Sequence, residues 1–172
     1  MQIRNIILAA SATAVTLAAP ATPSETFGVV AIHSGSGVQY SAFNAAKGSI
    51  LAGLDMEDAT FYIIDGVLYL YDKSTAAAEE IYVDRSGMGQ GLIGYTTGIQ
   101  GAPKNGEREG WAVNDNHLQF MGNDLIACPN SIDGAWSIWA SAGVANPAGN
   151  TDCVGIAARV EYTSNPTAAS TQ

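Results

Sequence analysis

The stretch Phe61-Tyr62-Ile63-Ile64-Asp65-Gly66-Val67-Leu68-Tyr69-Leu70-Tyr71 decides the fold class predicted for this chain. Apolar and aromatic residues flank Asp65-Gly66, a dipeptide that tolerates positive φ and favours a tight β-hairpin turn. A second stretch, Trp111 to Phe120, repeats its order: an aromatic, any residue, an aliphatic, a polar turn, then Leu, any residue, and Leu or an aromatic. The two stretches predict two equivalent hairpins.

The agreement continues beyond each hairpin, at an offset of about 45 to 50 residues. The matching segments are Ile81–Val83 with Leu125–Ala127, and Leu92–Tyr95 with Trp136–Trp139. A repeat of this size in a β-rich chain indicates a symmetric fold. Three such units of four strands form a β-trefoil, which we favour over a two-sheet β-sandwich. Its third unit would combine residues 27–52 with the C-terminal strand, which would close onto the first.

We expect an all-β domain of about twelve short strands, separated by turns rich in Gly, Asn, Asp and Pro. No apolar pattern at helical spacing extends beyond about two turns. Residues 45–54 and 74–79 can each form a helical turn instead. The expected strands are Phe27–His33, Val38–Phe43, Ser49–Ala52, Thr60–Ile64, Val67–Tyr71, Glu80–Asp84, Leu92–Thr96, Gly110–Val113, His117–Phe120, Leu125–Cys128, Trp136–Ala140 and Val154–Tyr162.

The N-terminus predicts secretion. A basic start is followed by an apolar, alanine-rich run, and cleavage after either Ala18 or Ala21 satisfies the small-residue rule for a signal peptide. The alternative interpretation is a buried N-terminal helix. We therefore expect the following organisation: a signal peptide over residues 1–18, a flexible segment over 19–26, one all-β domain over 27–162 and a disordered Ser/Thr-rich tail over 163–172.

The charge balance is acidic, with 16 Asp and Glu residues against 7 Lys and Arg residues. This balance argues against nucleic acid and anionic membrane surfaces as partners, because both attract basic faces. No segment after the signal peptide is long and apolar enough to span a membrane, so we expect no membrane partner.

Two cysteines, Cys128 and Cys153, lie in a chain directed to an oxidising space, so one intramolecular disulfide is possible. The alternative is a pair of buried free thiols. Neither cysteine has another Cys or a His at ligand spacing, and His33 and His117 are far apart in the sequence. We therefore expect no metal site.

No constellation of residues favours catalysis or a cofactor. Residues 86–91 contain Gly-x-Gly-x-Gly, but a dinucleotide site needs a helix next, and a strand is expected there. Asp84 with Glu107 or Glu109 offers a carboxylate pair of the kind that glycosidases use, yet the spacing selects no pair. A local ion pair of Asp84 with Arg85, or a turn cap, is the simpler interpretation. We expect no enzyme activity and no cofactor.

The aromatic residues are numerous for one domain, and aromatic faces can stack on sugar rings. We expect Trp111 and Trp136 in the core, and we take Trp139 and Tyr71 as candidates for exposed glycan-stacking residues. A cell-wall polysaccharide is the partner that such a site would bind.

Long runs of this sequence resemble the phialide cell-wall protein (PhiA) family of filamentous ascomycetes. The runs are Val29–Ser36, Tyr82–Gly91, Ile93–Gly98, Leu125–Asn130, Trp136–Trp139 and Asn150–Gly155. The resemblance implies a secreted, structural wall protein with a role in phialide and conidium development, related to known allergens. Because the family has no established enzyme activity, the resemblance transfers no catalytic residue. A lectin-like glycan-binding module and a secreted antimicrobial toxin or effector are the alternative functions.

Overall fold

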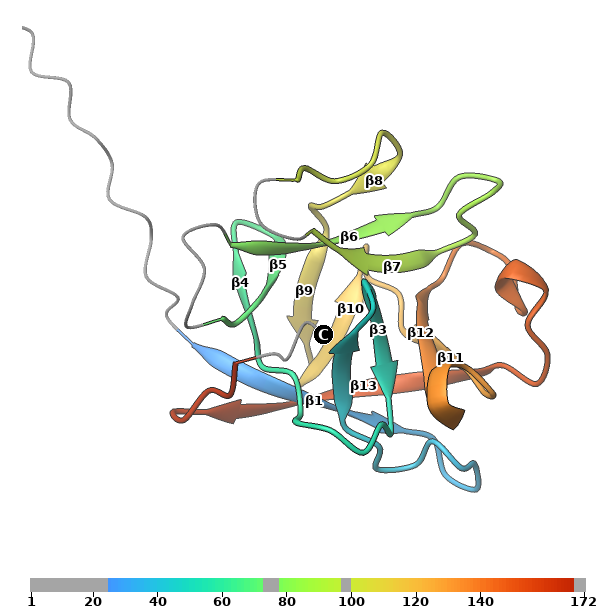
Figure 1. Cartoon of the computed structure of the whole chain (residues 1–172), viewed down its shortest axis with the longest axis horizontal. Coiled ribbons are helices and arrows are strands. Elements are labelled where there is room, and N and C mark those ends of the chain that lie inside the picture. Colours follow the sequence, from blue (N-terminus) through green and yellow to red (C-terminus); the bar gives the residue numbers. More distant parts are fainter. Residues whose placement is uncertain (1–24, 73–77, 97–99, 169–172) are drawn as a thin grey trace, which may run out of the picture.

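The computed structural model describes residues 25–72, 78–96 and 100–168. They form thirteen β-strands and two short 3₁₀ helices, and this described part contains no α-helix, so the all-β prediction is confirmed (Figure 1). The expected signal peptide lies outside the described residues, as do most of the flexible segment, residues 169–172 of the tail and most of the possible helical turn over 74–79.

All thirteen strands belong to one antiparallel sheet. They are β1 (Thr26–Ile32), β2 (Phe43–Ala46), β3 (Ser49–Ala52), β4 (Phe61–Ile64), β5 (Val67–Leu70), β6 (Glu79–Asp84), β7 (Leu92–Tyr95), β8 (Gly106–Glu107), β9 (Trp111–Asn114), β10 (His117–Phe120), β11 (Leu125–Cys128), β12 (Trp136–Ala140) and β13 (Val154–Thr163). The 3₁₀ helices are η1 (Ile132–Gly134) and η2 (Pro147–Gly149).

The two hairpins that the repeated stretches predict are both present. Phe61 pairs with Leu70 across β4 and β5, and Trp111 pairs with Phe120 across β9 and β10. Their turns, Asp65-Gly66 and Asp115-Asn116, have positive φ at both residues, as a type I′ turn requires. The β2–β3 turn, Lys47-Gly48, has the same geometry.

Six strands close into a ring: β1 pairs with β4, β4 with β5, β9 with β10, β10 with β13, and β13 with β1. The remaining link joins β5 to the segment before β9, through the bridge between Val67 and Glu109 and a hydrogen bond from Trp111 N–H to Gly66 O. The pairing of β1 with β13 runs from Thr26–Thr163 to Ile32–Ala157. The C-terminal strand therefore closes onto the first strand, as expected.

Three further hairpins, β2–β3, β6–β7 and β11–β12, meet one another beside this ring (Figure 1). Ser49 of β3 pairs with Gly94 of β7, Ala52 of β3 with Trp136 of β12, and Leu92 of β7 with Trp139 of β12. Each of the three hairpins thus contacts the other two.

The core lies between the ring and the three hairpins and takes side chains from both. It contains Phe43, Ile50, Phe61, Leu68, Ile81, Ile93, Trp111, Leu118, Leu125 and Ile138. Trp111 is buried and the half-buried Trp136 packs against the same cluster, as the sequence predicts.

The segment before β3 departs from the prediction. The strand expected over Val38–Phe43 is wrong, because residues 34–40 form turns in which Gly35 and Tyr40 have positive φ. Val38 is buried from a turn, and the strand begins only at Phe43. Residues 45–54 contain the end of β2, a tight turn and all of β3, where a helical turn was the alternative. The two-residue strand β8 was not predicted.

Candidate functional site

The two candidates for glycan stacking do not form a common site. The expectation that Trp139 is exposed is wrong: it is 8% exposed, and its Nε1 donates to Ser137 Oγ at 2.8 Å. Its strand lies between two others, so that Trp139 faces Ile126 of β11 on one side and Leu92 of β7 on the other. Tyr71 is half-buried just after β5. A stacking role for Tyr71 stays a prediction.

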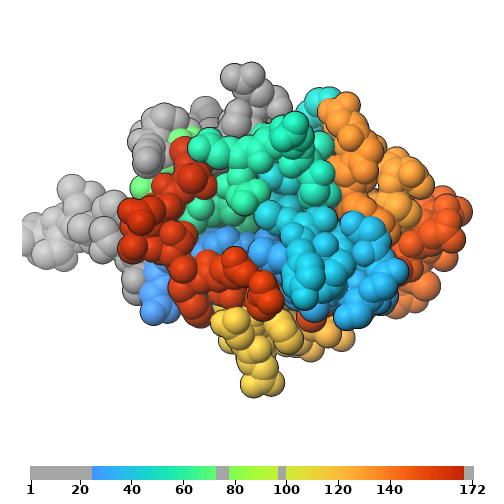
Figure 2. Space-filling view, turned by 90° about the horizontal axis from the view of Figure 1, so that it is seen from below, coloured from blue at the N-terminus to red at the C-terminus, as the bar shows by residue number. Residues whose placement is uncertain are grey.

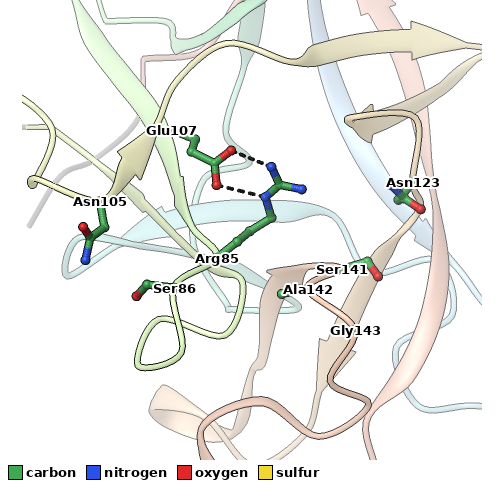
Figure 3. Close-up of a pocket in the computed structure, with 8 residues that line it drawn as sticks. All are labelled: Arg85, Ser86, Asn105, Glu107, Asn123, Ser141, Ala142 and Gly143. Atoms are coloured by element: carbon green, nitrogen blue, oxygen red, sulfur yellow. Dashed lines mark hydrogen bonds and ion pairs between the residues drawn. The ribbon is translucent and has the colours of Figure 1, made fainter.

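An open cleft with mostly polar walls, here called the polar cleft, lies where four separate segments of the chain meet (Figure 3). Its volume is about 690 Å³, within the range usual for small-molecule sites. It is lined by Arg85, Ser86, Asn105, Glu107, Asn123, Ser141, Ala142 and Gly143.

The floor of the polar cleft is an ion pair joined by two hydrogen bonds. Arg85 Nε donates to Glu107 Oε1 at 2.9 Å and Arg85 Nη2 donates to Glu107 Oε2 at 2.6 Å. The Arg85 guanidinium also lies 5.4 Å from the centre of the Phe120 ring. The hydrogen bond from Arg85 lowers the pKa of Glu107 and raises the pKa of Arg85. Both groups are therefore charged at neutral pH.

Arg85 does not pair with Asp84, contrary to one of the two expectations for that carboxylate. Arg85 directly follows the last residue of β6, and its guanidinium reaches Glu107 of β8, which pairs with β6 at Val83. The other expectation is confirmed, because Asp84 Oδ1 accepts the backbone N–H of Ser86 and caps the turn.

The loop from Ser86 to Gly91 lines the cleft with its first residue, Ser86, and its glycines are needed for close approach to other segments. A Cβ on Gly89 would overlap the Asp84 carboxylate, and a Cβ on Gly91, whose φ is +99°, would overlap Ala140 O. Hydrogen bonds from Gly91 N–H to Asp84 O and from Gln90 N–H to Ser86 O hold the loop at 2.8 and 2.9 Å. The glycine pattern thus belongs to the loop between β6 and β7, and the expected strand follows it where a dinucleotide site needs a helix.

The facing wall, Ser141 to Gly143, is fastened to this loop. Ala140 N–H donates to Gly91 O at 2.8 Å, and Ala148 N–H donates to the Gln90 side chain at the same distance. These two hydrogen bonds therefore hold the two walls against each other.

A second cleft, of about 520 Å³, lies between residues 56–60 and residues 161–167. Thr167 Oγ1 donates to Asp58 O at 2.8 Å, and Thr167 N–H donates to Thr60 Oγ1 at 3.1 Å. Figure 2 shows this C-terminal segment, in red, beside β1 and the segment before β4. The tail is thus attached to the domain as far as Thr167, whereas disorder of the tail as a whole stays a prediction.

Two buried polar atoms in the described part of the chain have no hydrogen-bond partner, Glu79 Oε2 and Trp111 Nε1. Burial raises the pKa of Glu79, and the nearby Asp72 carboxylate adds to this effect.

Tyr62 and Tyr69 stack across β4 and β5, with ring centres 5.1 Å apart.

The predicted disulfide joins Cys128 to Cys153 and links the end of β11 to the segment before β13. Within residues 25–72, 78–96 and 100–168, no three or more metal-ligating side chains gather into a group. The same residues contain no helix of the length and hydrophobicity that a membrane crossing needs.

Comparison with known proteins gives one consistent family. Residues 27–170 match the family described as "PhiA-like secreted protein". Three relatives carry the name "Cell wall protein phiA". The one from Aspergillus fumigatus is 66% identical and the one from Aspergillus niger is 61% identical, each over 96% of both chains. The one from Emericella nidulans is 61% identical over 98% of this chain and 97% of its own. No solved structure matches this chain.

Proposed function

This chain belongs to the PhiA-like family of secreted proteins, and from that membership we propose that it is a non-catalytic structural protein of the fungal cell wall that acts in phialide and conidium development. The observation that carries the proposal is the identity of 61 to 66% to proteins named as cell-wall proteins, across nearly the whole chain.

The chemistry of the polar cleft supports a non-catalytic role. A glycosidase needs one carboxyl group with a raised pKa to protonate the leaving oxygen. The carboxyl group that lines the cleft is Glu107, and Arg85 holds its pKa low. Glu79, whose pKa is raised, is 3% exposed and does not line the cleft.

For the fold, we propose a β-trefoil. Its support is the ring of six strands together with three hairpins that contact one another pairwise. The hairpin β4–β5 with β6–β7 and the hairpin β9–β10 with β11–β12 supply two units, and β13 with β1, β2 and β3 supplies the third. An experimental structure with its strand axes related by a threefold rotation is the expected result, and two stacked sheets would contradict it.

The domain division also stands as a proposal, with a signal peptide over 1–18, a short segment over 19–26, the domain over 27–162 and the tail over 163–172. N-terminal sequencing of the secreted protein should find Ala19 or Thr22 as the first residue, according to cleavage after Ala18 or Ala21. A chain that begins at Met1 in the medium would refute the signal peptide.

The proposed function is tested by deleting the gene and by fractionating the wall. Deletion should alter wall composition or reduce phialide and conidium formation, and the protein should be recovered with the wall. Normal walls and normal conidia in a clean deletion strain would contradict the proposal. If an Asp84→Ala variant expressed in the deletion strain restores normal walls and conidia, this result would agree with a role that needs no carboxylate catalysis.

A further inference from the structure

We propose that the polar cleft binds a neutral polysaccharide chain of the cell wall. The inference rests on the proposed function, because it names the class of wall component that the protein would contact. It assigns the contact to the segments around Arg85, Asn105 and Ser141, and not to the aromatic residues that the sequence suggests.

The charges of the cleft favour a neutral ligand. Arg85 and Glu107 are the charged residues that line it, and each neutralises the other through two hydrogen bonds. An anionic ligand would have to compete with Glu107 for the guanidinium, and the chain as a whole carries a net charge of −9. The second cleft, by contrast, is lined by the acidic residues Glu57, Asp58 and Glu161, and no basic residue of the described ranges lines it.

The remaining polar side chains can both donate and accept hydrogen bonds. Within the described part of the chain, the Asn105 amide and the Ser141 hydroxyl have no side-chain partner. Asn123 donates from Nδ2 to Met121 O, which leaves its Oδ1 available to accept. Ligands with many hydroxyl groups satisfy such a mixture, because each hydroxyl donates once and accepts twice.

These groups are arranged on both sides of the ion pair. Figure 3 shows Asn105 and Ser86 on one side of Arg85, and Ser141 and Asn123 on the other. Because the hydrogen bond between Ala140 N–H and Gly91 O fastens the two walls, a ligand would meet a preformed surface and little ordering would oppose binding.

The shape of the cleft favours a chain and not a small enclosed molecule. It is open to solvent, so a ligand lying on the Arg85–Glu107 floor is free to extend beyond both sides. A polysaccharide would therefore present one or a few of its internal sugar units to the cleft.

Purified mature protein should be titrated calorimetrically with laminarin (a soluble β-glucan), with chitohexaose and with mannan. Wild-type protein should bind at least one of them. Asn105→Ala combined with Ser141→Ala should weaken that binding about tenfold, because two hydrogen bonds are lost. Asn165→Ala, which removes another exposed asparagine outside the cleft, is the matched control and should leave affinity unchanged.

A second pair of variants tests the place of binding without removing a polar group. Ala142→Trp places a large ring in the cleft and should abolish binding, whereas Ala145→Trp, at an exposed site in the same loop outside the cleft, should not. Unfolding curves show whether each variant is folded. Full affinity in a folded Ala142→Trp variant, or no wild-type binding to any of the three glycans, overturns the inference, as does stronger binding to acidic polygalacturonate. Wall fractionation tests the proposed function separately.

Discussion

Substitution of Gly91 by alanine should destabilise this domain far more than the same substitution at Gly87, four residues earlier in the same loop. At Gly91 the φ of +99° and the nearness of Ala140 O both act against a Cβ, whereas a Cβ at Gly87 would have no atom within 4 Å. The two positions differ in backbone conformation and space but share their loop, so Gly87→Ala is a matched control.

The magnitude follows from two terms. A left-handed backbone costs alanine about 1–2 kcal/mol relative to glycine. Relief of the overlap must lengthen the 2.8 Å bond from Ala140 N–H to Gly91 O, and loss of that bond costs about 1 kcal/mol. We therefore expect Gly91→Ala to lower the free energy of unfolding by about 2–3 kcal/mol. Gly87→Ala should raise it by up to about 1 kcal/mol, because alanine restricts the unfolded chain.

Urea unfolding of the mature protein, followed by tryptophan fluorescence, measures both variants. The slope of free energy against urea should stay that of the wild type, because the surface exposed on unfolding is the same. If the free energies of unfolding of the two variants differ by less than about 0.5 kcal/mol, the close approach of Gly91 to Ala140 does not constrain the loop, and the reasoning fails.

Three other perturbations test separate parts of the structure. Reduction of the Cys128–Cys153 disulfide, whose cysteines are 25 residues apart, should lower the free energy of unfolding by about 3.5 kcal/mol; a Cys128→Ala/Cys153→Ala variant that still responds to reductant would show another cause. Glu79→Gln tests the buried carboxyl: the pKa of Glu79 is raised from 4.5, so the folded state holds its proton more tightly and wild-type stability from this group falls as pH rises above that value. The stability of Glu79→Gln relative to wild type should therefore grow as pH rises above about 4.5 in urea unfolding, and a constant difference would contradict this. Phe61→Ala, at a side chain that is 1% exposed, should cost about 3–5 kcal/mol in the same assay, and a loss below about 1 kcal/mol would mean that the core can close around the gap.

The hairpins could be predicted from the sequence because their determinants are local. Asp65-Gly66 and Asp115-Asn116 set the turn, and the alternating residues on each side set the register. Strand β2 has no such local signal. Its Asn44 is fully buried and is satisfied from a distance, by accepting from Leu54 N–H and donating to Glu57 O. The sequence of such a short, alanine-rich segment is compatible with a helical turn as much as with a strand.

The polar cleft could not be predicted, because its residues are brought together only by tertiary structure. Arg85 is next to Asp84 in the sequence, but its partner Glu107 comes from β8, a strand of two residues that pairs with β6. For Trp139, the sequence predicted an exposed side chain, whereas the structure shows a buried one. Since Ile138 faces the core, alternation directs Trp139 outward, yet the meeting of β12 with β7 and β11 covers its ring.

The pairing of β1 with β13 has a mechanical consequence. Thr26 lies opposite Thr163, so the two ends of the domain leave from the same end of one antiparallel pair. Tension applied between these ends would first break the bonds of Thr167 to Asp58 and Thr60. It would then load the Thr26–Thr163 pair and open the two strands one residue pair at a time. A domain held in the wall by both ends would therefore lengthen under small forces, in steps, before its disulfide-linked interior carried any load.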